Sequence, residues 1–117
     1  MTPAAIEKFL LSLPGATLSL QWGDERVFKI GGKMFAVMSP RLERPCRLSF
    51  KAAEDSFHIL TRAKGIVPAP YLARAHWVKL ERINALKPVE LRAYLTRAHA
   101  LVGSGLPKKT RATLGLG

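Results

Sequence analysis

The first residues of the chain carry apolar side chains at helical spacing. A hydroxyl residue followed by proline, Thr2-Pro3, is typical of a helix N-terminus. Pro14-Gly15 interrupts the pattern, because neither residue readily continues a helix. Four apolar residues recur every three or four positions between these limits: Ile6, Phe9, Leu10 and Leu13. The spacing predicts a helix with one apolar face.

Between residues 17 and 51 the period changes from helical to two. Apolar and polar residues alternate through 17–22 and 46–51, which is typical of strands with one buried face. Residues 26–30, with Phe28 and Ile30 on one side, and 33–38 are predicted as the two strands between them. Gly31-Gly32 indicates a tight hairpin, since glycine tolerates the positive φ that such turns require. Short turns between four successive strands predict an antiparallel meander.

The second half of the chain returns to helical spacing twice. We expect a helix over 52–63, a fifth strand over 77–83 and a last helix from Pro88 to Val102. The fold class predicted is therefore α+β, with an antiparallel sheet of about five strands and helices packed on one face. We expect a single domain over 1–107 and a basic, flexible C-terminal tail over 108–117.

The stretch PAPYLARAHWVKL, residues 68–80, allows two interpretations. In the structural one, the prolines stiffen the crossing into the fifth strand, Tyr71 plugs the end of the core and Trp77 begins the strand. In the functional one, aromatic and basic side chains form a cleft that holds a nucleotide base or an anionic ligand. The candidate cleft residues are Trp22, Tyr71, Arg74, His76 and Trp77.

Composition adds one extreme value, the charge. Nineteen Lys and Arg stand against eight Asp and Glu, giving a net charge of +11. Such a charge attracts polyanions, of which nucleic acid is the most abundant, although a solvated basic surface also keeps a protein soluble. The single cysteine, Cys46, excludes an internal disulfide. No apolar run reaches membrane-spanning length and the N-terminus lacks a signal peptide's basic start, so we expect a cytoplasmic protein.

Catalytic and metal-binding patterns are scarce. The histidines, His58, His76 and His99, do not stand at metal-ligand spacing. The acidic pairs Asp24-Glu25 and Glu54-Asp55 fall where turns and helix starts favour acids. We therefore predict no enzymatic activity, no metal and no cofactor.

Basic residues show more order than acidic ones. The alternation directs Lys29, Arg47 and Lys51 away from the predicted core, and a basic face can follow a phosphate backbone. Sheets also place cations outside simply to protect their edges. The candidate phosphate contacts are Lys29, Lys33, Arg41, Arg44, Arg47 and Lys51, with Lys108, Lys109 and Arg111 as a flexible tether.

Several segments together resemble the MmcQ/YjbR family. They are LSLPGATLSLQWGDERVFKIGGKMFAVM, LSFK, GIVPAPYLARAHWVKL and ELRAYLTRAHALVGSGLPKKTR. The resemblance as a whole covers about residues 6–111. That family is similar in fold to the CyaY/frataxin-like and secretion-chaperone-like α+β group. The resemblance implies DNA binding through a "double wing" of two hairpins, here 22–35 and 38–51. It implies no catalytic residues, and the first helix lacks the acidic ridge that iron binding would need.

Two function classes follow. The leading hypothesis is a non-enzymatic protein that binds duplex DNA through the basic sheet face and its hairpins. The alternative is a chaperone-like interaction module that binds a peptide or an acidic protein along an apolar patch or a sheet edge. The sequence does not predict an oligomeric state.

Overall fold

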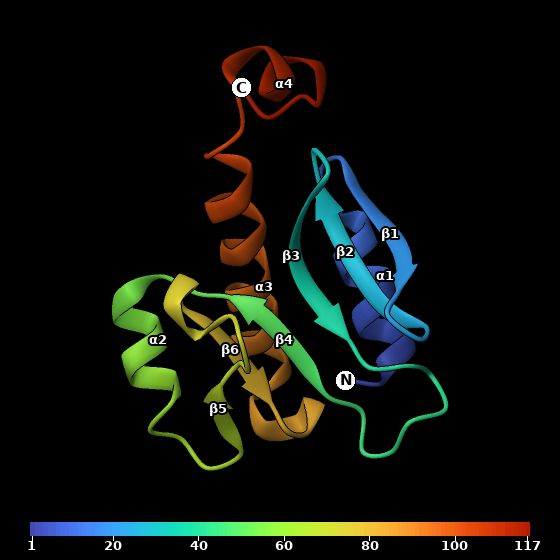
Figure 1. The fold of residues 1–117 in the computed structure, drawn as a ribbon, viewed down its shortest axis with the longest axis vertical. Coiled ribbons are helices and arrows are strands. Elements are labelled where there is room, and N and C mark those ends of the chain that lie inside the picture. The colour runs from blue at the N-terminus through green and yellow to red at the C-terminus, as the bar shows by residue number, and fades with distance from the viewer.

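A computed structural model describes residues 1–117 and contains one open antiparallel sheet (Figure 1). The strands lie in the order β1-β2-β3-β4-β6-β5. Their bounds are β1 Ala16–Gln21, β2 Glu25–Ile30, β3 Lys33–Met38, β4 Leu48–Lys51, β5 Ile66–Pro68 and β6 Trp77–Leu80. The predicted α+β class and antiparallel sheet are confirmed, with six strands where about five were expected.

Four α-helices pack against the sheet, with α1 and α3 behind β1 to β4 in Figure 1. They are α1 Pro3–Ser12, α2 Glu54–Leu60, α3 Pro88–Gly103 and α4 Lys108–Thr113. Two short 3₁₀ turns cover Ala73–Ala75 and Ile83–Ala85. The start of α1 follows the prediction, because the Thr2 hydroxyl accepts a hydrogen bond from the Ala5 N–H at 3.1 Å.

The core lies between the helix-facing side of the sheet and the helices. Strand register aligns Phe28, Ala36, Phe50 and Val78 in one row across β2, β3, β4 and β6. All four are fully buried and belong to one cluster of 18 apolar residues, which also takes side chains from α1, α2 and α3. The alternation of side chains along the strands therefore correctly predicted that Phe28 and Phe50 point into the core.

The missed strand is β5, which pairs with β6 at one edge of the sheet. It has only three residues and ends in Pro68, so it offers no readable alternation. Three elements are shorter than predicted: β4 begins at Leu48, α2 covers 54–60, and β6 ends at Leu80 before a 3₁₀ turn. Local patterns specify an element's presence better than its ends.

Residues 108–117, expected as a flexible tail, contain the short helix α4. Leu114 and Leu116 are partly buried against the core, and Leu106 just before α4 is buried. A Cβ placed on Gly31 would lie 2.7 Å from a Leu106 methyl group, so the β2–β3 turn rests directly on this leucine. Apolar contacts spaced along the tail hold it against the domain.

Candidate functional site

The sheet face opposite the helices carries several of the predicted cations. Register aligns Val27, Val37, Ser49 and Lys79 across this open face. Lys29, Arg47 and Lys51 occupy positions of the same parity on β2 and at β4, so their side chains leave the sheet on this side.

A polar hollow of about 250 Å³ lies on the open face. Burial raises the pKa of the Glu25 carboxyl, and the nearby cations Arg47 and Lys79 oppose that shift only in part. Arg47 forms an ion pair with Glu43, and its backbone N–H donates to the Ser39 hydroxyl at 2.8 Å. The lining residues are Glu25, Val37, Ser39, Arg47, Ser49, Pro70 and Lys79.

A second group of cations comes from the β2–β3 hairpin, the end of β4 and the start of α4. Lys33 and Lys51 line one open hollow with Trp77 and the end of α3. Lys108 and Lys109 begin α4, directly after the Leu106 contact with the hairpin turn. We call Lys33, Lys51, Lys108 and Lys109 the hairpin-end cluster, and none of the four forms an ion pair.

The remaining candidate phosphate contacts lie elsewhere. Arg41 and Arg44 belong to the β3–β4 loop, and Arg41 turns toward the helix side, where it meets Glu7. Arg111 lies on α4 beside His99 and Ser104. The nine cations are thus distributed over the open face, the hairpin end and the β3–β4 loop, and do not form one continuous surface.

The candidate cleft residues are not brought together. Trp22 lies in the β1–β2 turn at one edge of the sheet, whereas Tyr71 follows β5 at the opposite edge. Tyr71 is fully exposed with a φ of 65°, so it does not plug the core as expected. His76 packs on Phe57 with ring centroids 5.5 Å apart, and Trp77 is buried as it begins β6.

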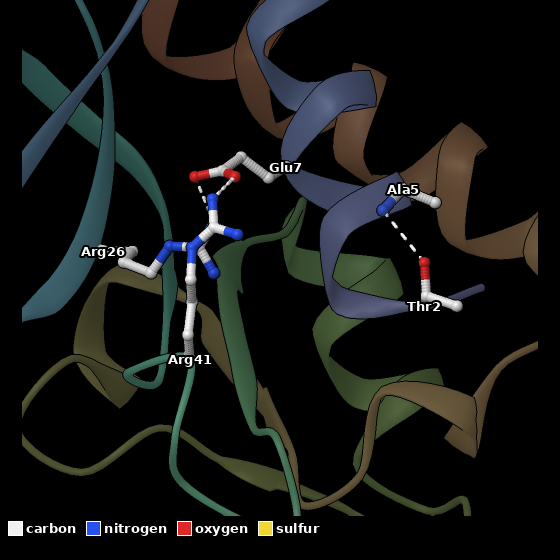
Figure 2. A network of polar contacts seen from close by, with 5 residues as sticks. All are labelled: Thr2, Ala5, Glu7, Arg26 and Arg41. Atoms are coloured by element: carbon white, nitrogen blue, oxygen red, sulfur yellow. Dashed lines mark hydrogen bonds and ion pairs between the residues drawn. The ribbon is translucent and has the colours of Figure 1, made fainter.

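The structure assembles an ion cluster that sequence reasoning missed (Figure 2). The Glu7 carboxylate on α1 forms ion pairs with Arg26 on β2 and with Arg41. Arg26 is only 3% exposed, because it projects from the same side of β2 as Phe28. The alternation of side chains along β2 already places Arg26 on the core side. A cation at an inward position was therefore the sequence feature that could have revealed this ion cluster.

This cluster borders a hollow of about 360 Å³ between α1, β1 and the β3–β4 loop. Leu20 and Leu42 are 62% and 95% exposed beside it, which is unusual for leucine side chains gathered in one place. The lining residues are Glu7, Leu18, Leu20, Asp24, Arg26, Pro40, Arg41 and Leu42. We call this hollow the β1 groove.

The structure contains neither a group of metal ligands nor a membrane-spanning helix. No three His, Cys, Asp or Glu side chains come together as metal ligands would. None of the helices combines the length and the apolar character required to cross a bilayer. Neither observation identifies a partner or a compartment, and the cytoplasmic location stays a prediction.

Comparison with known proteins identifies relatives of this architecture. The crystal structure of Deinococcus radiodurans protein DR2400, described by the domain DUF419, superposes with a TM-score of 0.87 at 27% identity, covering 99% of this chain and 89% of that one. A Pseudomonas syringae structural-genomics protein superposes with a TM-score of 0.72 at 17% identity, covering 87% and 99%, and so shares the fold. No curated protein matches the chain. The YjbR family profile matches residues 11–101, and the chain therefore belongs to the YjbR family.

Proposed function

We propose that this protein is a non-enzymatic DNA-binding protein whose hairpin-end cluster and open sheet face contact the phosphates of a duplex. One observation carries the proposal. Of nineteen Lys and Arg side chains, only Arg26, Arg41 and Arg47 form ion pairs. The other sixteen cations form no ion pair and can attract a polyanion, and releasing counterions from DNA would drive the binding.

The hairpin-end cluster is the best-organised part of this surface. Lys33 follows the tight Gly31-Gly32 turn, and Lys108 and Lys109 begin a helix that is anchored through its neighbours Leu106 and Leu114. Lysines on anchored backbone lose less conformational freedom on binding than lysines on a disordered tail would lose. Phosphate contacts of this kind position a protein on DNA without selecting a base sequence.

The test is the salt dependence of binding to a fluorescent DNA duplex, measured by anisotropy. Each phosphate contact contributes about 0.9 to the log–log slope of affinity against salt. A Lys33→Ala/Lys108→Ala variant should therefore lower the slope by about 2 and weaken binding alike for two unrelated duplex sequences.

A matched control removes the same charge from other parts of the surface. Lys8 on α1 and Lys64 after α2 are exposed and lie outside the hairpin-end cluster. The Lys8→Ala/Lys64→Ala variant should keep a slope close to that of the unmodified protein. Equal slopes for the two double variants, or an affinity that does not change with salt, would contradict the proposal.

A further inference from the structure

The two edges of the sheet differ in how they are protected. The outer strand β5 has three residues and ends in proline, and such features discourage pairing with another chain. The opposite outer strand, β1, has six residues, ATLSLQ, without a charge or a proline. Its outer backbone N–H and C=O groups have no strand partner, because β1 pairs only with β2. This edge is available for strand addition.

Apolar side chains continue from this edge into the β1 groove. Leu18 and Leu20 leave β1 on the helix-facing side, since they pair with Phe28 and Arg26 of β2. Neither leucine is covered as the core leucines are, and the exposed Leu42 faces the same hollow from the β3–β4 loop. An added strand could bury all three against its own side chains.

A buried donor also faces the groove. Arg26 is 3% exposed, and its Nη1 has no hydrogen-bond partner although Glu7 pairs with its Nη2. Leaving such a group unpaired is costly in a buried setting, so it calls for an acceptor. Arg41 shares Glu7 and remains 63% exposed, whereas the second acid of the hollow, Asp24, is solvated at its rim.

We propose that the β1 edge and the β1 groove bind an extended acidic peptide segment of a partner protein. The peptide main chain adds to β1 as a seventh strand, and an apolar side chain packs on Leu18 and Leu20. A carboxylate of the peptide accepts hydrogen bonds from Arg26 and Arg41. A second copy of this chain is disfavoured as the occupant, because each copy carries a charge of +11 and the two would repel.

The experiment begins with a phage-displayed library of random 12-residue peptides, selected on the full chain. We expect enrichment of sequences with alternating apolar residues and at least one Asp or Glu. Selected peptides should shift the backbone amide signals of residues 16–21 in ¹⁵N-correlated NMR spectra. A selection that yields no binder, or only basic binders, overturns the proposal.

Serine substitutions locate the site without disturbing the core. Leu20→Ser and Leu42→Ser should each weaken the selected peptide by about tenfold, the effect of losing one leucine contact. Ile59→Ser on α2 and Val89→Ser on α3 remove apolar side chains that are 64% and 71% exposed elsewhere on the surface, and should leave binding unchanged. If the control variants weaken binding as much as the groove variants, the site is wrong.

Two further measurements distinguish the alternatives. Sedimentation without peptide should show a monomer, and a dimer that Leu20→Ser dissociates would identify a second copy as the occupant and overturn the proposal. The Lys33→Ala/Lys108→Ala variant should bind peptide normally, and Leu20→Ser should bind DNA normally. If DNA binding fails, the peptide result can still be interpreted. If peptide binding fails, the DNA result can still be interpreted.

Discussion

The two faces of the sheet each hold a glutamate beside two cations, and the difference between them is how deeply the arginine beside the glutamate is buried. On the helix-facing side Glu7 lies between Arg26 and Arg41, with Arg26 only 3% exposed. On the open side Glu25 lines a polar surface hollow together with Arg47 and Lys79. One carboxylate and two cations therefore stabilise the fold where α1 covers them. Where a similar set lies at the surface, its cations stay available to a ligand.

The difference in burial gives the charged residues of the two faces different roles. Removing water from Arg26 makes its partner Glu7 necessary, because a buried guanidinium without a carboxylate is very costly. On the open face, solvent screens the pairs, so Arg47 and Lys79 can exchange one anion for another at little cost. A ligand phosphate can compete for the open cations, whereas on the helix side Glu7 already pairs with Arg26 and Arg41 and leaves the buried Nη1 of Arg26 as an unpaired donor.

The largest effect expected comes from breaking the buried pair. Glu7→Ala leaves Arg26 without its carboxylate and brings it beside Arg41, so the free energy of unfolding should fall by about 3 kcal/mol. Urea denaturation measures this change. The variant Glu7→Leu/Arg26→Met replaces both charges with apolar groups and should lie within about 1 kcal/mol of the unmodified protein. A double variant as unstable as Glu7→Ala would show that the charges themselves stabilise the fold.

An intermediate effect should follow from the exposed partner of the same glutamate. Arg41→Ala removes a 63% exposed side chain, and its cost should stay below about 1 kcal/mol because solvent screens the pair. The open-face control, Glu43→Ala, removes the partner of Arg47 and should cost less than about 0.5 kcal/mol. Urea midpoints compare the two variants. If Arg41→Ala lowers the free energy of unfolding nearly as much as Glu7→Ala does, the exposed pair stabilises the fold as strongly as the buried one and the expectation is wrong.

The smallest effect concerns the pH dependence contributed by Glu25. Its folded-state pKa is raised, chiefly by burial, so ionising it is harder in the folded protein than in the unfolded chain. The stability present below the unfolded-state pKa is then lost as pH rises through the folded-state pKa. Glu25→Gln should gain stability relative to the unmodified protein between pH 3 and pH 7, measured by thermal melts. A stability difference that is constant with pH, or that changes in the opposite direction, would contradict this.

Much of the fold could be predicted from the sequence because its signals are local. Alternation placed Phe28, Ile30, Leu48 and Phe50 inside, and Gly31-Gly32 marked the hairpin. Strand β5 was missed because three residues ending in proline carry no period. Alternation also oriented Lys29, Arg47 and Lys51 correctly with respect to the core.

The candidate sites were less predictable, since they depend on contacts between distant residues. Trp22 and Tyr71 were expected in one cleft, but strand order places their turns at opposite edges of the sheet. Arg41 was expected on the DNA-facing surface, but the path of the β3–β4 loop turns it toward Glu7. The spacing of residues 7, 26 and 41 along the chain does not indicate that their side chains form one ion cluster.

The sequence by itself determined which side chains point into the sheet's core, where the chain turns, and that the protein carries a large positive charge. Those properties follow from the strand period of two residues, the helix period of 3.6 residues and the composition. Each segment of the chain shows its own periodicity and composition independently of the other segments. Only the tertiary structure decided which cations are neutralised, which sheet edge is left open, and which leucines remain exposed. These depend on strand order and on where α1 and α3 end, and such long-range packing brings together residues that no local pattern connects.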